Sequence, residues 1–307
     1  MSVTHKRRAL ALIKTMRLPF LALTPACLFL GYVTARAANP DVALADVVLI
    51  VLGAGCAHVS VNMLNEYFDF RSGLDALTVR TPFSGGSGGL LEDPSAAVSV
   101  LVGGLIALGI TLVVGGYFVA TKGALLLPLG SLGVAILVTY TTWLNHHPLL
   151  CLVAPGIAFG PIYVLGTHFV LAEAFSASAL CASLVVFFVT SNLLLVNQIP
   201  DVAADRQVGR RHLPIAYGAR TSGMVFCALA AGALLVAVCG VIEDLLPGLA
   251  VVAMVFVVAQ LATSLRFLQT LNSQRADSTE QLLPFMALNV AAAIGTPLLL
   301  GVSFILG

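Results

Sequence analysis

The chain has 307 residues, of which 59% are hydrophobic and only 9% are charged, and its formal net charge is +1. Soluble domains carry about 25% charged residues, so this composition excludes a water-facing surface over most of the chain. So small a net charge also excludes a general electrostatic attraction to nucleic acid. In hydrocarbon only helices or closed barrels satisfy the backbone, and the continuous, non-alternating apolar runs predict an all-α fold.

The amino-terminal segment is short and basic. It reads His5-Lys6-Arg7-Arg8, and the apolar run behind it leads to Ala35-Arg36-Ala37, which loosely imitates a secretory signal and its cleavage site. Because more apolar runs follow, rather than an exported polar domain, we expect a retained first span preceded by a basic arm.

Apolar segments of about 20 residues, the length that crosses a bilayer, follow one another along the whole chain. They predict one membrane domain, residues 1–307, organised as a polytopic bundle of nine transmembrane helices. The expected spans lie near residues 18–37, 43–65, 97–120, 123–144, 149–171, 176–198, 220–241, 246–268 and 282–305.

Lysine and arginine gather on one side of this topology, as they do in cytoplasmic loops. If the amino terminus is cytoplasmic, the inside set is Lys6, Arg7, Arg8, Lys14, Arg17, Arg71, Arg80, Arg206, Arg210, Arg211, Arg220, Arg266 and Arg275. Only Arg36 and Lys122 fall on the other side. The sequence therefore predicts an integral protein of the bacterial inner (cytoplasmic) membrane, with its two long polar loops on the cytoplasmic side.

The first polar loop begins at the end of the second expected span. Asn65 and Asp69 are four residues apart and share one helical face. Glu66 adds a carboxylate, and Gly73 permits a turn that brings Asp75 back beside them. Further on, residues 84–89 read Ser-Gly-Gly-Ser-Gly-Gly, which lacks the Lys and Ser/Thr of a P-loop. We expect this glycine-rich loop to act as a mobile cap.

The second polar loop repeats this arrangement four spans later. Asn197, Asp201 and Asp205 are spaced by four and again share a helical face. Pro200 removes a backbone donor, so it either kinks the helix or starts a new one. The recurring Asn-x-x-x-Asp spacing suggests that the bundle has two pseudo-related halves.

Several carboxylates that converge at a membrane surface repel one another, and a divalent cation relieves that repulsion. Mg²⁺ prefers oxygen ligands and is typically held by a few carboxylates together with substrate phosphate oxygens. The predicted metal ligands are Asn65, Glu66, Asp69, Asp75, Asn197, Asp201 and Asp205. Guanidinium groups fit phosphate oxygens in pairs, and the predicted substrate-binding arginines are Arg71, Arg80, Arg206, Arg210 and Arg211.

A simpler interpretation treats each of these residues as a solvated helix-end charge. It suits any one residue, but it does not account for two acidic motifs on the same face with Asn at matching offsets. The combination indicates a phosphate-rich ligand held between the two loops.

These motifs resemble those of the UbiA superfamily of intramembrane prenyltransferases, whose members pair Asn-x-x-x-Asp after the second helix with Asp-x-x-x-Asp after the sixth. The nine-span count also agrees. The run Asn65-Glu66-Tyr67-Phe68-Asp69, followed by Asp75, is most similar to the branch that prenylates 1,4-dihydroxy-2-naphthoate for menaquinone biosynthesis. Glu66 stands where that branch commonly has Asp.

The resemblance implies Mg²⁺-dependent transfer of a prenyl group from an allylic (poly)prenyl diphosphate to an aromatic acceptor. Two Mg²⁺ ions would bridge the diphosphate to Asp69, Asp75, Asp201 and Asp205 and stabilise the leaving group. Tyr140 matches a recurrent family tyrosine and would face the allylic cation or the reacting carbon; the alternative is an interfacial anchor.

Three departures from the family pattern leave the acceptor open, and the residues do not specify the prenyl chain length. Asn145-His146-His147-Pro148 follows Tyr140 where relatives often have Lys or Arg, residues 154–156 lack a frequent acidic residue, and His212 replaces Ser or Thr. His146 and His147 are interpreted as a surface pair. The roles of all three histidines and the oligomeric state remain open.

Three other functions are alternatives. A CDP-alcohol phosphotransferase is also embedded in the membrane, but its continuous aspartate motif does not occur in this sequence. A terpene cyclase of the same fold, and a non-catalytic carrier of an anionic lipid or metabolite, stay open. Because the carboxylates gather at helix ends rather than at mid-membrane depth, the sequence favours the enzyme, with membrane lipid and the two substrates as its only expected partners.

Overall fold

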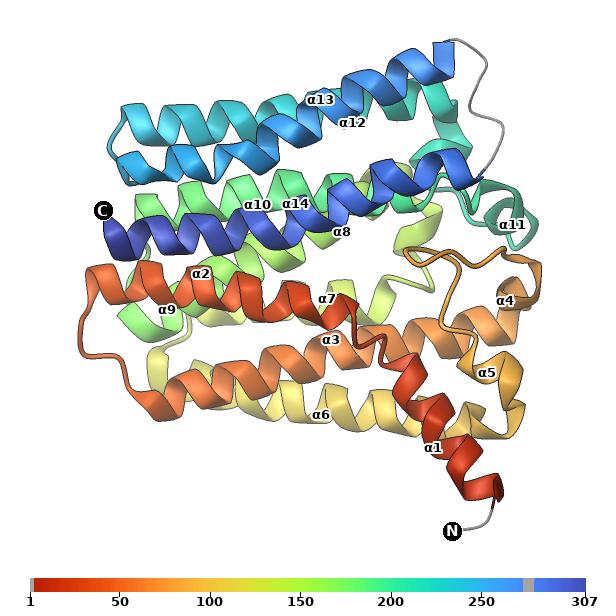
Figure 1. The fold of residues 1–307 in the computed structure, drawn as a ribbon. Helices are drawn as coiled ribbons and strands as arrows, with labels where there is room; N and C mark the ends of the chain where they lie inside the picture. The colour runs from red at the N-terminus through yellow and green to blue at the C-terminus, as the bar shows by residue number, and fades with distance from the viewer. Residues whose placement is uncertain (1–2, 273–278) are drawn as a thin grey trace.

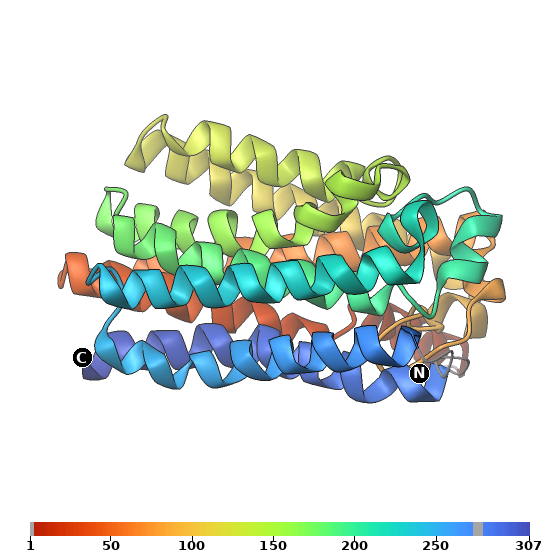
Figure 2. The same ribbon diagram turned by 90° about the horizontal axis from the view of Figure 1, so that it is seen from above.

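The computed structural model describes residues 3–272 and 279–307, and all regular structure within them is helical. Arg275, one of the predicted inside residues, lies outside the described residues. The helices that make up the spans lie side by side along one axis as an elongated bundle (Figures 1 and 2). They are α2 (Leu23–Ala38), α3 (Leu44–Ser72), α6 (Ala97–Lys122), α7 (Leu126–Thr139), α8 (Pro148–Ile157), α9 (Gly166–Ala172), α10 (Ala177–Asn197), α12 (Leu213–Ile242), α13 (Met254–Asn272) and α14 (Thr279–Leu306). The predicted all-α membrane bundle is confirmed.

Eight helical stretches of the described chain are long and apolar enough to cross a membrane. The ninth expected span, near 123–144, is shorter: α7 has 14 residues, about 21 Å at 1.5 Å per residue, against a hydrocarbon core of about 30 Å. Gly123 starts the turn that precedes α7, and the chain turns again after Tyr140. Helix α7 still takes its place in the up-and-down order, and the two termini lie at opposite ends of the bundle (Figure 1).

Helix α10 is the central helix and α6 is a peripheral one. In the most apolar window of α10, 67% of the residues are buried, compared with 22% for the span that contains α6. Helix α10 packs against α8, α12 and α14, while α3 pairs with α6. The second acidic motif therefore directly follows the most enclosed helix, and the first lies on a helix that packs against a peripheral one.

The span between residues 148 and 172 changes its helical pitch midway. Helix α8 passes into the π-helical segment η4 (Ala158–Leu165) and then into α9. Pro155 and Pro161 interrupt the backbone hydrogen bonds here, a recognised cause of such bulges. Gly160 packs directly on α10, since a Cβ there would lie 2.4 Å from the Ser183 carbonyl oxygen.

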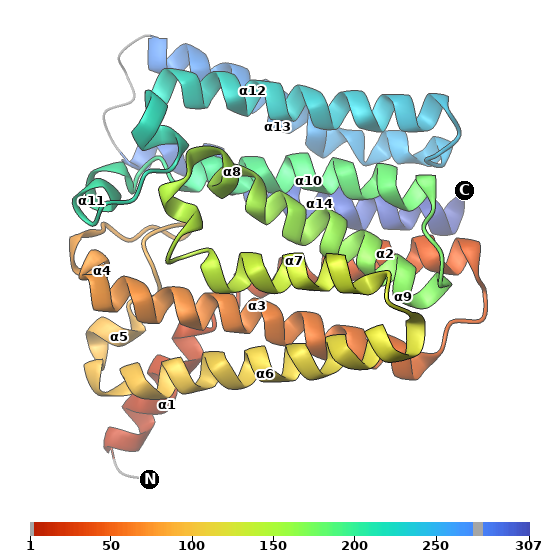
Figure 3. The ribbon, with the colours of Figure 1, turned by 180° about the vertical axis from the view of Figure 1, so that it is seen from behind.

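The short helices gather at one end of the bundle (Figures 1 and 3). They are α1 (Val3–Thr15), α4 (Leu74–Leu77), α5 (Gly89–Glu92) and α11 (Val202–Gln207), with the short turns η1 (Phe20–Ala22), η2 (Pro94–Ala96) and η3 (Leu144–His146). The turn η5 (Gly248–Val252) lies at the opposite end, between α12 and α13 (Figure 1). Because α3 and α10 both finish at this end, the two polar loops share one end of the molecule, as the sequence predicted. Helix α1 runs obliquely across it.

Candidate active site

Two chain reversals bring the acidic residues together. Helix α3 ends at Ser72, and Gly73, with φ 80°, turns the chain into α4 so that Asp75 is buried. Helix α10 ends at Asn197, and α11 begins directly after Asp201. Pro200 lies in the turn between α10 and α11, so it separates two helices rather than kinking one.

The two loops enclose one cavity of about 370 Å³. The predicted site residues that line it are Asn65, Asp69, Asp75, Tyr140, Asn197, Asp201, Asp205 and Arg210. Below them the walls become apolar and include Leu23, Phe159, Val290 and Ile294. The cavity thus joins a charged mouth to a hydrophobic interior.

Arg210 links the two acidic motifs. Its guanidinium pairs with Asp69, and its Nη1 lies 3.0 Å from Asp205 Oδ1. The second Asp205 oxygen lies 2.8 Å from His212 Nε2. Arg210 therefore forms ion pairs with both loops. His212, which departs from the family pattern, contacts an acidic residue of the site.

Several oxygens around the cavity have no hydrogen-bond partner among the described residues. They are Asp75 Oδ2, Asn145 Oδ1, Asn197 Oδ1 and Asp201 Oδ1. Unpartnered buried oxygens are costly in a folded protein and call for a ligand or ion. Hard oxygen donors of this kind suit Mg²⁺.

Two carboxyls of the site that lie outside the spans, those of Asp75 and Asp201, have raised pKa values. Burial, followed by repulsion from Glu66 and Asp69, raises the pKa of Asp75 to about 7. Burial and then Asp205 raise the pKa of Asp201 to about 7, although a hydrogen bond from Ser84 acts in the opposite direction. A cation between the loops would stabilise both carboxylates in their charged form.

Within the described ranges, no three carboxylate, imidazole or thiol side chains already converge as a ready metal site. Arg210 lies between two of the predicted ligands, Asp69 and Asp205. Amide oxygens, water and phosphate oxygens would therefore complete the shell of any Mg²⁺ ion, which is how this ion is usually bound.

Glu66 has a different position from the one that the sequence suggested. It is fully buried and does not line the cavity. Its Oε1 accepts hydrogen bonds from Arg17 Nε at 2.6 Å and from the Ser87 backbone N–H at 2.8 Å. Its Oε2 accepts one from Ser87 Oγ at 2.6 Å. Glu66 therefore ties α3 to the turn after α1 and to the glycine-rich loop.

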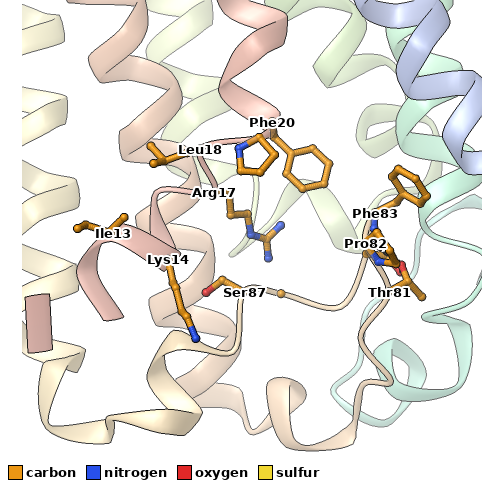
Figure 4. Close-up of a pocket in the computed structure, with 12 residues that line it drawn as sticks. Ile13, Lys14, Arg17, Leu18, Phe20, Thr81, Pro82, Phe83 and Ser87 are labelled. Atoms are coloured by element: carbon orange, nitrogen blue, oxygen red, sulfur yellow. Dashed lines mark hydrogen bonds between the residues drawn. The ribbon is translucent and has the colours of Figure 1, made fainter. Parts of the chain in front are cut away.

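Arg17 is a site residue that the sequence indicated only as one of the charges that set the membrane orientation. Its guanidinium lines the main cavity and also a second hollow of about 320 Å³ between α1 and the glycine-rich loop. Figure 4 shows Arg17 between the turn after α1 and the segment that carries Ser87. Arg17 is far from both acidic motifs in the sequence, so no helical spacing predicted that it would lie beside them.

The glycine-rich loop forms part of the cavity wall through Ser84, Gly85 and Gly86. Gly86 has φ 75°, and a Cβ at this position would lie 2.9 Å from Asp75 Oδ1. Thr81 holds the start of the loop by accepting hydrogen bonds from the Phe83 and Ser84 backbone amides. The loop is thus fixed at both ends and lies against an acidic residue.

Four predicted substrate-binding arginines lie outside the cavity wall. Arg71, Arg80, Arg206 and Arg211 are exposed, and the Arg211 backbone N–H donates to the Asn145 carbonyl oxygen at 2.9 Å. The structure brings Arg210 alone of the five predicted arginines into the lining. His146 and His147 also lie outside it.

The fold and the site define an intramembrane helical protein with two opposed acidic motifs at one end of a partly apolar cavity. The sequence model of the UbiA prenyltransferase family matches residues 22–300, and the chain belongs to this family. It is 29% identical over 167 residues to the 1,4-dihydroxy-2-naphthoate octaprenyltransferase of Bacillus subtilis (strain 168), an alignment that covers 52% of this chain and 51% of that protein. The chain thus spans about half the length of the curated relative that it matches.

Solved structures share the fold over nearly the whole chain. A UbiA homolog from Archaeoglobus fulgidus bound to GPP and Mg²⁺ has a TM-score of 0.62 and 14% identity, covering 97% of this chain and 100% of that one. The apo structure of a UbiA homolog from Aeropyrum pernix K1 has a TM-score of 0.63 and 20% identity, covering 92% and 97%.

Proposed function

We propose that this protein transfers a prenyl group from an allylic (poly)prenyl diphosphate to an aromatic acceptor such as 1,4-dihydroxy-2-naphthoate. The observation that carries the proposal is that the two acidic motifs line one cavity whose deeper walls are apolar. Such a cavity suits a charged diphosphate joined to a hydrocarbon chain. The named activity of the Bacillus subtilis relative, and the GPP and Mg²⁺ bound by the Archaeoglobus fulgidus homolog, support it.

The proposed Mg²⁺ ligands are Asp69, Asp75, Asp201 and Asp205, with the amide oxygens of Asn65 and Asn197 in support. Two bound Mg²⁺ ions would supply Lewis-acid stabilisation of the pyrophosphate leaving group. Glu66 is left out of this set, because, unlike Asp205, it does not line the cavity; its oxygens accept hydrogen bonds from Arg17 and Ser87 instead.

The other side chains position the substrates. Arg210 and Arg17 line the cavity and present guanidinium donors to phosphate oxygens. Tyr140 presents its ring to the same space, where an aromatic face attracts the developing positive charge on the allylic carbon. The apolar walls take the hydrocarbon chain and exclude water from that carbon. The exposed arginines around the mouth would attract the anionic substrate at longer range.

The test is an assay of the purified protein with Mg²⁺, an allylic prenyl diphosphate and a panel of aromatic acceptors. Released pyrophosphate and the mass of the products are measured. Asp69→Ala and Asp201→Ala are expected to reduce turnover by at least about 100-fold, the scale on which loss of a transition-state contact acts. Asp41→Ala, an exposed aspartate outside the cavity, is the control and is expected to retain full activity.

Other outcomes would contradict the proposal. Undiminished turnover in both cavity variants would remove the metal assignment. A cyclised prenyl product that forms without any acceptor would identify a terpene cyclase, and substrate binding with no product would favour a carrier.

A further inference from the structure

Beneath the charged residues the cavity has a second polar layer, formed by His58 and Thr190, which both line it. His58 precedes Asn65 by seven residues on α3, and Thr190 precedes Asn197 by seven residues on α10. Seven residues make almost two turns, so each side chain shares the face of its asparagine and lies about 10 Å deeper. The two helices therefore place one polar group each at a matching depth.

The His58 ring is held in one orientation. It is buried, its Nδ1 lies 2.7 Å from Thr24 Oγ1, and it meets the Phe159 ring edge-on with 5.2 Å between centroids. No second hydrogen bond to this imidazole occurs among the residues that the structure describes. The other ring nitrogen, Nε2, is therefore left for a molecule in the cavity, whichever tautomer the contact with Thr24 selects.

The Thr190 hydroxyl is an independent sign of a ligand. Thr190 is 1% exposed, and its Oγ1 has no hydrogen-bond partner in the described part of the chain. A helical threonine usually satisfies its hydroxyl on the carbonyl one turn earlier. A buried hydroxyl without a partner is costly unless something else occupies the site.

We propose that His58 and Thr190 bind the neutral hydroxyl or carbonyl group of the acceptor ring, at the end remote from the bond that forms. This inference rests on the proposed function. A prenyl chain has no hydrogen-bonding atom and would leave both groups unpaired. A carboxylate at this depth would be buried without a cation, which is more costly still. Phe159, beside His58, supplies an aromatic wall for the ring.

The reacting geometry fits this assignment. The diphosphate would be held at the level of the acidic residues, so the allylic carbon would lie near Asn65 and Asn197. A ring placed under that carbon extends toward the deeper layer, and its far oxygen reaches His58 and Thr190. Discrimination among acceptors would then depend on the far oxygen, since a site built to hydrogen-bond a hydroxyl rejects analogues that lack it.

The experiment compares two acceptors that differ only at the far oxygen, 1,4-dihydroxy-2-naphthoate and 1-hydroxy-2-naphthoate, with geranyl diphosphate as donor. His58→Leu and Thr190→Val are each expected to raise KM for the dihydroxy acceptor about fivefold, the effect of one neutral hydrogen bond. The preference for the dihydroxy acceptor shrinks by the same factor, and KM for geranyl diphosphate is unchanged. Thr190→Ser keeps the hydroxyl and is expected to restore the preference.

The chain offers a matched control. His168 is also buried, with its Nδ1 3.1 Å from Thr34 Oγ1, but it does not line the cavity. His168→Leu removes the same kind of pair and is expected to leave the acceptor preference unchanged. If His58→Leu does not fold, His58→Gln and the two Thr190 variants provide the same comparison.

An unchanged preference in the His58 and Thr190 variants would overturn the inference, as would a shift in KM for geranyl diphosphate, which would place the layer along the prenyl chain. Absence of product from the wild-type protein would instead count against the proposed function. In that case equilibrium binding of the two naphthoates, measured by calorimetry, decides whether these residues discriminate between them.

Discussion

Arg210 is the residue through which the two acidic motifs contact each other. It pairs with Asp69 on α3 and with Asp205 on α11. A buried cation shared by two carboxylates stabilises both loops in one arrangement, and its removal leaves uncompensated charge. The same guanidinium faces the cavity, so it also has a donor for phosphate.

Arg210→Gln is expected to lower kcat/KM for the prenyl diphosphate by about 10- to 100-fold, the range for a hydrogen bond to a charged group. Arg210→Lys is expected to recover little of this, because an ammonium lacks the planar fork that reaches two oxygens. Arg220→Gln, an exposed arginine outside the lining, is the control. Steady-state kinetics check the prediction, and full rescue by lysine would contradict the two-point contact.

The raised pKa values of Asp75 and Asp201, each about 7, predict a pH-dependent affinity for Mg²⁺. Below pH 7 the proton competes with the metal, so the affinity rises with pH and levels off above pH 7. Each proton displaced on binding changes the affinity about tenfold per pH unit. Aspartates of ordinary pKa would already be ionised at pH 5 and would give a flat profile.

Calorimetric titration of Mg²⁺ at pH 5.5, 6.5 and 8 measures this dependence. The same raised pKa values also determine how the stability of the metal-free protein changes with pH. A carboxyl with a raised folded-state pKa destabilises the fold once the unfolded chain ionises, so the metal-free protein loses stability between about pH 4 and pH 7. Added Mg²⁺ should reverse that loss, and a metal-free stability that rises over this range would contradict the assignment.

At the scale of single residues the sequence correctly placed Asn65 and Asp69 on one helix, but not what lies opposite them. Asn197 and Asp201 do not share a helix, since α10 ends at Asn197 and α11 begins after Asp201, yet both line the cavity together with Asn65 and Asp69. Glu66 is the instructive exception. It lies one position round the helix from Asn65 and faces Arg17, whose approach depends on how α1 folds back over α3.

Among the elements, the glycine-rich loop has a conformation that depends on residue size. Gly86 combines φ 75° with a close approach to Asp75. An added methyl group meets both a backbone penalty of about 1 kcal/mol and the Asp75 carboxylate. The loop must then move away from the site.

Gly86→Ala is therefore expected to reduce turnover by roughly ten- to a hundredfold, the effect of displacing substrate-positioning groups by about 1 Å. Gly218→Ala is the matched control: Gly218 also has positive φ, 80°, but an added methyl group there would meet no neighbouring atom within 4 Å. It is expected to lose stability and keep its turnover. Thermal unfolding and steady-state kinetics separate the two effects, and equal turnover losses would show that backbone strain alone is responsible.

The helices themselves were largely predictable, because membrane spans can be recognised by their length and hydropathy. Helix α7 is where this reasoning was least complete. The expected span runs on to residue 144, yet the helix ends at Thr139 and the chain turns through residues 140–143. Tyr140 and Asn145 reach the cavity because of that early end. Hydropathy alone does not predict a turn made of threonines and a tryptophan.

Over the whole molecule, the two ends of the bundle differ in how their polar groups are satisfied. At the site end several oxygens, including those of Asp75, Asn197 and Asp201, have no partner among the described residues. The opposite end is closed by ion pairs between helices. Such a division is expected of an enzyme, because convergent ligand groups destabilise a fold and other regions must offset that cost.

The ion bridge at the closed end allows this division to be tested. Lys122 Nζ lies 2.9 Å from Asp46 Oδ2 in the first turn of α3 and 2.9 Å from Glu173 Oε1 just after α9. Lys122→Met leaves the buried Asp46 carboxylate unpaired, which is expected to cost about 1–3 kcal/mol of stability. Glu173→Gln is expected to cost less than about 1 kcal/mol, since the Glu173 side chain is 62% exposed.

The double variant Lys122→Met/Asp46→Asn is expected to recover most of the lost stability. Asparagine has nearly the same shape as aspartate but no charge, so the variant removes the unpaired charge without leaving a cavity. All three variants should turn over at the wild-type rate, since Asp46, Lys122 and Glu173 lie outside the cavity lining. Thermal unfolding in detergent and the prenyl transfer assay are the two measurements. A fall in turnover without a fall in stability would show that the closed end affects the reaction. The two ends of the bundle would then be coupled, and the division between a stabilising end and a catalytic end would not hold.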